Sequence, residues 1–410
     1  MELYVHIPFC VHKCGYCDFL SFNADAQLIE SYIDALCTEL DGLKEQFTTC
    51  FIGGGTPSVV PVGLMEKLLK KIAGMEITDE FSIECNPGTV DEEKLRLYKA
   101  YGINRISFGL QSADDRELAL LGRIHTLGEF LESYELALKC GFENINIDLM
   151  SGLPGQNCLS FEKTLKTVTE LDVKHLSVYG LIIEEGTRFY ELYADKPDKT
   201  PSADNSKYRE RNRDKISEPV PLPDEDEERE MYHMTAKILK DYGFYRYEIS
   251  NYAKKGYECH HNLGYWTGEE YIGTGIGAAS YLHLPGYGVK GEDHLRIQAA
   301  RYANTRDIRE YIDHYNDRTG TVRDIRELSE ELNAVDLARE YIILHLRLTK
   351  GFEMAEFERV FGYDLKKAYG KVINRYLTLG LLEMDSDHLR LTERGLDLSN
   401  TVMADFLGDE

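Results

Sequence analysis

The chain is short of positive charge and has no long apolar run. Its 410 residues include 47 lysines and arginines against 71 aspartates and glutamates, which gives a formal net charge of −24. A protein that binds nucleic acid must neutralise phosphates with Lys and Arg, so we expect no nucleic-acid partner. No segment approaches the roughly 18 apolar residues that span a bilayer, so we do not expect an integral membrane protein.

Disulfide bonds are not expected either. The nine cysteines are an odd number, six of them are scattered, and no signal-peptide pattern precedes the first. We therefore expect a cytoplasmic protein in which those six act as small apolar residues. The other three, Cys10, Cys14 and Cys17, form a Cys-x-x-x-Cys-x-x-Cys segment directly after a predicted strand.

This segment has the chemistry of an iron–sulfur site. A four-iron cube has four corners to ligate, and three thiolates from one loop leave the fourth iron open to a cosubstrate. Zinc is the main alternative, but zinc sites are usually built from two ligand pairs, and only Cys14 and Cys17 have that spacing. The segment resembles the motif of radical S-adenosylmethionine (SAM) enzymes. That resemblance implies a [4Fe–4S] cluster held by Cys10, Cys14 and Cys17, with SAM beside it.

The N-terminal half alternates short apolar runs with amphipathic segments, a pattern that predicts parallel βα units. We expect strands at residues 3–7, 49–52, 81–84, 105–108, 144–149 and 175–179, and helices at 28–46, 62–73, 92–101, 129–139 and 161–171. Six such units form a partial (β/α)6 barrel, an α/β fold whose chemistry takes place at the carboxyl ends of the strands.

The composition divides the chain into four parts. Residues 1–194 form the radical SAM barrel, and the highly charged stretch 195–218 is expected to be a surface insertion. Residues 219–320 extend the barrel. Residues 321–410 form a smaller C-terminal α+β domain, similar to a winged helix, with a hairpin at 381–391.

Polar or glycine-rich residues follow the predicted strands, at the edge where one ligand can touch them all. The run 53–56 (Gly-Gly-Gly-Thr) would bring backbone N–H groups close to a charged ligand. Acidic residues there can bind a ribose diol, a glutamine offers a donor and an acceptor, and an arginine can pair with a carboxylate. Each one alone is equally well a structural hydrogen-bonding group. By resemblance to radical SAM proteins we assign to the SAM site Tyr4, Gly54, Gly55, Thr56, Glu84, Gln111, Arg123 and Asp148. His6, on the same face of its strand as Tyr4, either orders the cluster loop or forms a hydrogen bond in the core.

Three longer segments show which radical SAM family the chain resembles. They are 4–10 (Tyr-Val-His-Ile-Pro-Phe-Cys), 53–57 (Gly-Gly-Gly-Thr-Pro) and 152–156 (Gly-Leu-Pro-Gly-Gln). They resemble the oxygen-independent coproporphyrinogen III oxidase (HemN-like) family, and the likeness runs through nearly the whole chain. Phe19 stands where the oxidase pattern has a fourth cysteine, and 261–266 (His-Asn-Leu-Gly-Tyr-Trp) matches the His-Asn-x-x-Tyr-Trp signature of the HemW-type haem chaperone branch.

That signature is suited to haem, because an imidazole can ligate iron and aromatic rings can stack on the macrocycle. We expect His261 to be the axial ligand, with His260 and Cys259 as alternatives. The structural interpretation is that His261 and Asn262 tie a loop together while Trp266 fills the core.

The resemblance implies a haem chaperone that binds a [4Fe–4S] cluster, SAM and haem. It would pass haem to acceptor proteins such as membrane respiratory enzymes, and a homodimer is compatible with this role. The alternative is an enzyme that oxidatively decarboxylates coproporphyrinogen III to protoporphyrinogen IX, with the cluster reducing SAM. A zinc-stabilised structural protein is a third interpretation.

Overall fold

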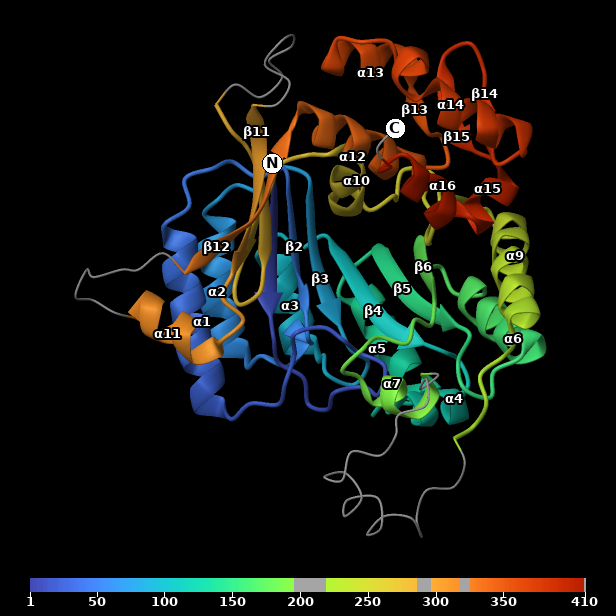
Figure 1. Cartoon of the computed structure of the whole chain (residues 1–410). Helices are drawn as coiled ribbons and strands as arrows, with labels where there is room; N and C mark the ends of the chain where they lie inside the picture. The colour runs from blue at the N-terminus through green and yellow to red at the C-terminus, as the bar shows by residue number, and fades with distance from the viewer. Residues whose placement is uncertain (195–218, 286–295, 317–324, 409–410) are drawn as a thin grey trace, which may run out of the picture.

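The computed structural model describes residues 1–194, 219–285, 296–316 and 325–408, and the expected insertion at 195–218 lies outside them. Within residues 1–194, six parallel strands alternate with helices, as the sequence predicts (Figure 1). The strands are β1 (Glu2–Ile7), β2 (Thr49–Gly54), β3 (Glu80–Cys85), β4 (Arg105–Gln111), β5 (Asn144–Ser151) and β6 (His175–Gly180). The helices are α1 (Ala26–Asp41), η1 (Pro57–Val59), α2 (Val62–Ala73), α3 (Glu92–Ala100), α4 (Asp115–Leu121), α5 (Leu127–Lys139), α6 (Cys158–Thr169) and α7 (Arg188–Tyr193).

The barrel strands are apolar on their outer face and polar on their inner face. Leu3, Val5 and Ile7 of β1 are fully buried in the main hydrophobic core. The alternating residues Tyr4 and His6 line a cavity between the strands, because successive side chains of a strand point to opposite faces. In closed eight-stranded barrels, branched apolar side chains fill the interior. The polar interior of this barrel instead leaves room for a ligand.

The six strands belong to a larger mixed sheet, which in the described residues has the order β12-β11-β10-β9-β1-β2-β3-β4-β5-β6-β8-β7. Next to β1 lies the parallel β9 (Tyr271–Thr274), followed by the antiparallel β10 (Ala279–His283), β11 (Ile297–Asn304) and β12 (Arg326–Asn333). Beyond β6 lie β8 (Asn251–Ala253) and β7 (Tyr245–Arg246), both antiparallel to their neighbours. The helices of this region are α9 (Glu225–Asp241), α10 (His260–Thr267) and α11 (Ile308–Asn316). The expected α/β fold is confirmed, but the sequence did not predict these outer strands.

The chain after β12 has a hydrophobic cluster of its own. Its helices are α12 (Ala334–Leu346), α13 (Met354–Phe361), α14 (Leu365–Thr378), α15 (Glu393–Asp397) and α16 (Ser399–Asp405). They accompany a small antiparallel sheet of β13 (Phe352–Glu353), β15 (His388–Leu391) and β14 (Leu382–Met384). Ile342, Phe357 and Leu389 are buried in this second cluster. The expected smaller C-terminal α+β unit is therefore present, and the hairpin β14–β15 lies where the sequence predicts it.

Among the helices that the structure describes, none has both the length and the apolar character needed to cross a membrane.

Candidate functional site

The three clustered cysteines lie on the loop between β1 and α1, and this loop is tied at both ends. The N–H of Cys10 donates to the carbonyl of Phe22 at 3.0 Å, and the N–H of Phe22 donates to the carbonyl of Pro8 at 2.8 Å. The Nε2 atom of His6 lies 2.9 Å from the carbonyl oxygen of Leu20. His6 thus contacts the loop directly, in line with the first of the two roles that the sequence leaves open for it.

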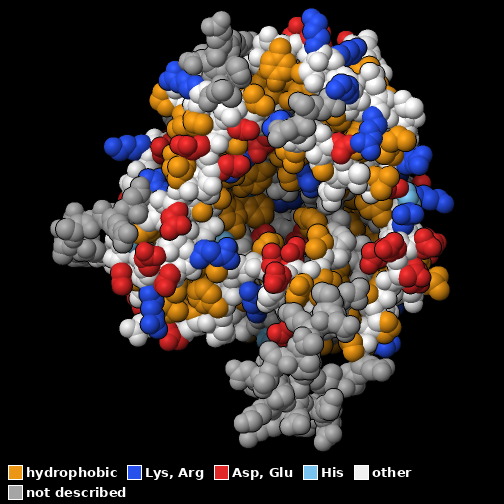
Figure 2. All heavy atoms as spheres, viewed as in Figure 1, with side chains coloured by type: hydrophobic (Ala, Val, Ile, Leu, Met, Phe, Trp, Pro, Cys, Tyr) orange, Lys and Arg blue, Asp and Glu red, His pale blue; other side chains and the backbone are white. Residues whose placement is uncertain are grey.

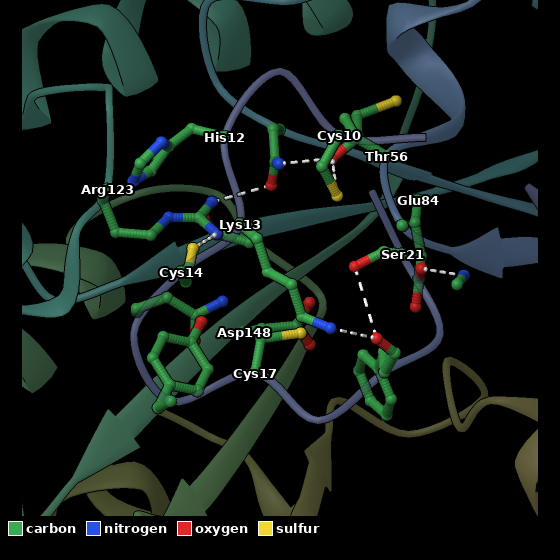
Figure 3. A pocket seen from close by; sticks show the side chains of 18 of the residues that line it. Cys10, His12, Lys13, Cys14, Cys17, Ser21, Thr56, Glu84, Arg123 and Asp148 are labelled. Carbon is green, nitrogen blue, oxygen red and sulfur yellow. Dashed lines mark hydrogen bonds between the residues drawn. The ribbon is translucent and has the colours of Figure 1, made fainter. Parts of the chain in front are cut away.

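Cys10, Cys14 and Cys17 all line one pocket, where Figure 3 shows them around a common space. All three are free and partly exposed thiols. The hydroxyl of Thr56 lies 3.5 Å from Cys10 Sγ, and Arg123 Nη1 donates to Cys14 Sγ at 3.5 Å. The guanidinium thus places a positive charge beside a sulfur atom that would carry negative charge as a metal ligand.

This donor set fits a four-iron cube. In the described parts of the chain, no three His, Cys, Asp or Glu side chains are grouped so as to hold one metal ion. A cube requires a different arrangement, with one thiolate for each of three irons. Three thiols on a tied loop, facing one pocket beside a guanidinium, provide that arrangement.

The glycine segment after β2 packs against the cysteine loop. Gly54 has a φ of 111°, a conformation that favours glycine. A Cβ atom on Gly54 would lie 2.4 Å from Cε1 of His6, and one on Gly55 would lie 2.8 Å from the carbonyl oxygen of Phe9. These glycines are therefore needed for the close approach of the end of β2 to β1 and to the loop that follows β1.

The backbone N–H groups of this segment are not free. Gly54 donates to Glu84 Oε2 at 2.9 Å, while Gly55 and Thr56 donate to carbonyl groups of β1 and the loop after it, at 2.8 and 2.7 Å. The expectation that these N–H groups are open to a ligand is therefore wrong. An ammonium group requires acceptors rather than donors, so backbone carbonyl oxygens and the Thr56 hydroxyl are the groups that can meet one.

Arg123 and Gln111 reach the same pocket from the β4–α4 region. Arg123 Nη2 donates to Asn86 Oδ1 at 2.7 Å and to the carbonyl of Gly109 at 2.6 Å. Gln111 has a φ of 73°, next to a register shift in the pairing of β4 with β5. A non-glycine residue with positive φ costs free energy, and such residues cluster at ligand sites. The backbone of Gln111 thus supports its place in a binding site.

Glu84 and Asp148 supply the carboxylates of the pocket. Asp148 accepts hydrogen bonds from Ser107 Oγ at 2.9 Å and from Asn146 Nδ2 at 2.8 Å. Burial, together with the charge of Asp148, raises the pKa of Glu84 to about 7. Two carboxyl groups that face one cavity can together bind the hydroxyl groups of a diol.

A cavity continues from this pocket into the barrel; we call it the lumen. Glu84, Ser107 and Asp148 line both the pocket and the lumen. Tyr4 also lines the lumen, and its hydroxyl lies 3.0 Å from His6 Nδ1. Figure 2 shows that the viewed face of the molecule is deeply hollowed, with hydrophobic and charged side chains inside the hollow.

Helix α10 covers the amino-terminal ends of the strands. His261 Nδ1 lies 2.7 Å from the hydroxyl of Thr49, the first residue of β2, and the N–H of His260 donates to the carboxylate of Glu80, the first residue of β3. His261 and Tyr265 line the lumen from this side. The cysteine pocket and α10 therefore lie at opposite ends of the strands.

His261 is only 1% exposed and both of its ring nitrogens have partners. Nδ1 lies against Thr49, and Nε2 lies 3.0 Å from the hydroxyl of Tyr265. Burial lowers the pKa of His261 to about 4. The imidazole is therefore neutral near pH 7 and bonded on both sides.

The two alternative ligands lie elsewhere. Cys259 is fully buried and its thiol donates to Glu80 at 3.3 Å; burial raises its pKa, which keeps it protonated. His260 is half-exposed, with Nδ1 at 2.6 Å from Asp79 Oδ2. Of the three candidates, only His261 is among the described residues that line the lumen. Trp266 stacks with Arg347, whose guanidinium carbon lies 4.3 Å from the centre of its ring.

Known proteins resemble this chain along its whole length. The profile of the Radical SAM superfamily matches residues 4–168, and that of the HemN C-terminal domain matches residues 332–398. "Heme chaperone HemW" of Bacillus subtilis (strain 168) is 34% identical, over 99% of this chain and 99% of the relative. "Heme chaperone HemW" of Escherichia coli (strain K12) is 30% identical, over 100% of this chain and 98% of the relative. The chain belongs to the HemW haem chaperone family. Its radical SAM fold implies a [4Fe–4S] cluster and SAM.

A solved structure also resembles this HemW-family chain. Coproporphyrinogen III oxidase (HemN) from Escherichia coli, described as a radical SAM enzyme, aligns with a TM-score of 0.77 and 21% identity. The match covers 99% of this chain and 89% of that one. At this level of identity the likeness shows the fold alone.

Two further polar residues of this HemW-family chain belong to the site and were not predicted from the sequence. Asn86 donates to the Thr56 hydroxyl at 2.7 Å and accepts from Arg123, so it joins two groups assigned to SAM. Arg105, the first residue of β4, lines the lumen. Asn86 follows a predicted strand and could have been found by position. Arg105 alternates with the polar Ser107 on one face of its strand, and this alternation is the sequence signal for its place in the lumen.

Proposed function

We propose that this chain binds a [4Fe–4S] cluster through Cys10, Cys14 and Cys17, one thiolate to each of three irons. The tied loop, the common pocket and the neighbouring Arg123 guanidinium support this assignment. When bound, the cluster and SAM supply the one-electron chemistry. The residues of the chain hold and orient them.

We propose that SAM lies across the mouth of the barrel. The Arg123 guanidinium would pair with the SAM carboxylate, while carbonyl oxygens of 54–55 and the Thr56 hydroxyl would accept from its amino group. At the other end of the ligand, Glu84 and Asp148 would bind the ribose hydroxyls. Gln111 would add a donor and an acceptor at the carboxyl end of β4. Tyr4 would approach SAM from the lumen side, where its hydroxyl is held by His6.

We propose haem as the cargo, and the lumen as the place where it is bound. The support is the continuity of the SAM pocket with a lumen that ends at the His-Asn-x-x-Tyr-Trp helix, together with the name that full-length relatives carry. His261 is neutral, and if Nδ1 donates to Thr49, then Nε2 carries the lone pair that iron requires. In that tautomer Tyr265 donates to Nε2, and haem iron would take the place of this hydroxyl. The hydrogen bond from Nδ1 to Thr49 thus fixes the tautomer in which Nε2 is the nitrogen that would bind iron.

We further propose that the protein works in the cytoplasm and forms a homodimer. We also propose the four parts set out from the sequence, with the last boundary moved to the end of β12 at Asn333, because β12 belongs to the barrel sheet. The bound haem would pass to acceptor proteins, among them membrane respiratory enzymes. The acidic chain argues that contact with an anionic membrane is brief.

One experiment separates this function from the oxidase. The reconstituted protein should bind haem with a shifted Soret band and should form no protoporphyrinogen IX from coproporphyrinogen III under anaerobic reducing conditions. We expect no decarboxylation because Phe19 stands where the oxidase pattern has a fourth cysteine. Phe19 is 61% exposed and lines the pocket. Sustained decarboxylation by the wild type would overturn the chaperone proposal and support the oxidase.

A further inference from the structure

Arg105 is one of the largest almost completely buried side chains in the described parts of the chain, with 2% of its surface exposed. It is the first residue of β4, and it lines the lumen together with Ser107 from the same strand. A guanidinium is charged at every pH at which the protein is folded. A permanent positive charge therefore lies inside the barrel, near the end that α10 covers.

This guanidinium has no hydrogen-bond acceptor among the residues that the structure describes. Its nearest carboxylate oxygen is Glu80 Oε2, 4.0 Å from Nε, which is too long for a hydrogen bond. The Nε atom is among the buried polar atoms that lack a partner. Glu80 is engaged elsewhere, because it accepts from Ser82 Oγ, Cys259 Sγ and the N–H of His260.

Arg123 provides the contrast. Its Nε atom also lacks a partner within the described ranges, but its Nη1 and Nη2 atoms donate to Cys14 Sγ, Asn86 Oδ1 and the carbonyl of Gly109. A buried arginine is usually satisfied in this way, because leaving its donors unpaired costs the desolvation of each. Arg105 has the 4.0 Å ion pair with Glu80 but no hydrogen bond from any of its nitrogen atoms to a described residue, and it lines a cavity. That is the arrangement expected of a guanidinium that binds a ligand.

We infer that Arg105 is the anion-binding residue of the lumen and that it holds a carboxylate of the ligand bound there. A guanidinium presents two parallel N–H groups that match a carboxylate. The acidic groups of the lumen, Glu84 and Asp148, lie farther along the strands, in register with Ser107 and Gly109 of β4, toward the SAM pocket. A ligand whose carboxylates point away from the SAM pocket would thus meet the positive charge of Arg105. The inference rests on the proposed haem site, where this carboxylate is a haem propionate.

The test compares haem with haem dimethyl ester, which has the same ring and iron but no free carboxylate. Both are titrated into the wild type, Arg105→Met, Arg105→Lys and the control Arg347→Met. Arg347 is a suitable control because it too has a buried Nε without a partner, but it stacks on Trp266 outside the lumen. Cluster iron and thermal midpoint are recorded for every variant.

The wild type should bind haem about tenfold or more tightly than the ester, as expected for charge-assisted hydrogen bonds. Arg105→Met should abolish this preference by lowering the affinity for haem and not that for the ester, and Arg105→Lys should retain part of the preference. Arg347→Met should retain all of it. If Arg105 is purely structural, its substitution should lower the affinities for haem and for the ester equally. The ratio of the two affinities would then stay unchanged, even where the variant is less stable.

The outcomes are distinct. If the wild type binds haem and Arg105→Met or Arg105→Lys keeps the full preference over the ester, the inference is overturned and the haem function stands. If the wild type binds neither porphyrin, the proposed function fails and this inference fails with it. Equal affinity of the wild type for both porphyrins also overturns the carboxylate role.

Discussion

The carboxylate of Glu84 accepts a hydrogen bond of 2.9 Å from the backbone N–H of Gly54. This contact joins β3 to the glycine segment that packs against the cysteine loop, so one side chain both shapes the pocket and faces the proposed ribose position. It also buries a carboxyl group next to a second one. Glu84 should therefore control the pH dependence of both stability and binding.

Glu84→Gln should change the pH dependence of stability. Burial and Asp148 raise the folded-state pKa from 4.5 to about 7, so the folded protein holds this proton more tightly than the unfolded chain does. Stability from this group is full below about pH 4.5 and is lost as the pH rises through about 7. The Gln variant should gain on the order of 2–3 kcal/mol relative to the wild type between these limits. Urea unfolding across this pH range measures the difference. The exposed Glu132→Gln should show the wild-type profile, and identical profiles for all three proteins would contradict the assignment.

Removing a cluster cysteine should remove the cluster. Cys10→Ala, Cys14→Ala and Cys17→Ala should each reduce bound iron and sulfide after anaerobic reconstitution to near background, since a cube held by two protein thiolates is no longer stable. Cys85→Ala is the sharp control, because Cys85 lines the same pocket but is only 2% exposed on β3. It should keep the wild-type iron content. Equal iron retention in all four variants would refute the ligand set.

Arg123→Ala should weaken SAM binding by roughly 2–3 kcal/mol, the value of a charge-assisted hydrogen bond. It should leave the affinity for 5′-deoxyadenosine, which has no carboxylate, close to that of the wild type. Glu84→Ala should weaken both ligands. Because Arg123 also donates to Cys14, calorimetry has to be run on samples of matched cluster content. The exposed Arg116→Ala on α4 serves as the control. Unchanged SAM affinity in both test variants would remove these residues from the site.

The inner strands could be predicted from the sequence because their apolar and polar residues follow the pattern of buried parallel strands. The first helix shows where such patterns stop being reliable. We expected it to run to residue 46, but α1 ends at Asp41, and Gly42 follows it as the C-cap, with its N–H donating to the carbonyl of Glu39. The strand β12 was missed for a different reason. Its sequence, Arg326–Asn333, is charged and largely exposed, and only its pairing with β11 makes it a strand.

The site shows the same division. Residues directly after the strands could be assigned because the carboxyl ends of parallel strands share one edge. The alternation with Ser107 places Arg105 on the inner face of β4, but its lack of a hydrogen-bond acceptor among the described residues could not be predicted, since it depends on where Glu80 and α10 lie in space. The expectation of free backbone N–H groups at Gly54 was wrong for a related reason. The sequence shows a glycine run but not the Glu84 carboxylate that occupies its donor.

The last prediction concerns the haem ligand. Nε2 of His261 is bonded to the hydroxyl of Tyr265, so iron must displace that hydroxyl. Tyr265→Phe removes the competitor and keeps the ring, and it should bind haem several-fold more tightly than the wild type. His261→Ala should shift the Soret band and weaken haem without changing cluster iron, whereas His260→Ala should leave the Soret band in place. Absorption titrations at matched cluster content measure all three. A purely structural His261 would give the opposite pattern: Tyr265→Phe would not strengthen haem binding, and His261→Ala would lower the thermal midpoint with an unaltered Soret position, because Thr49 and Tyr265 would lose their shared partner.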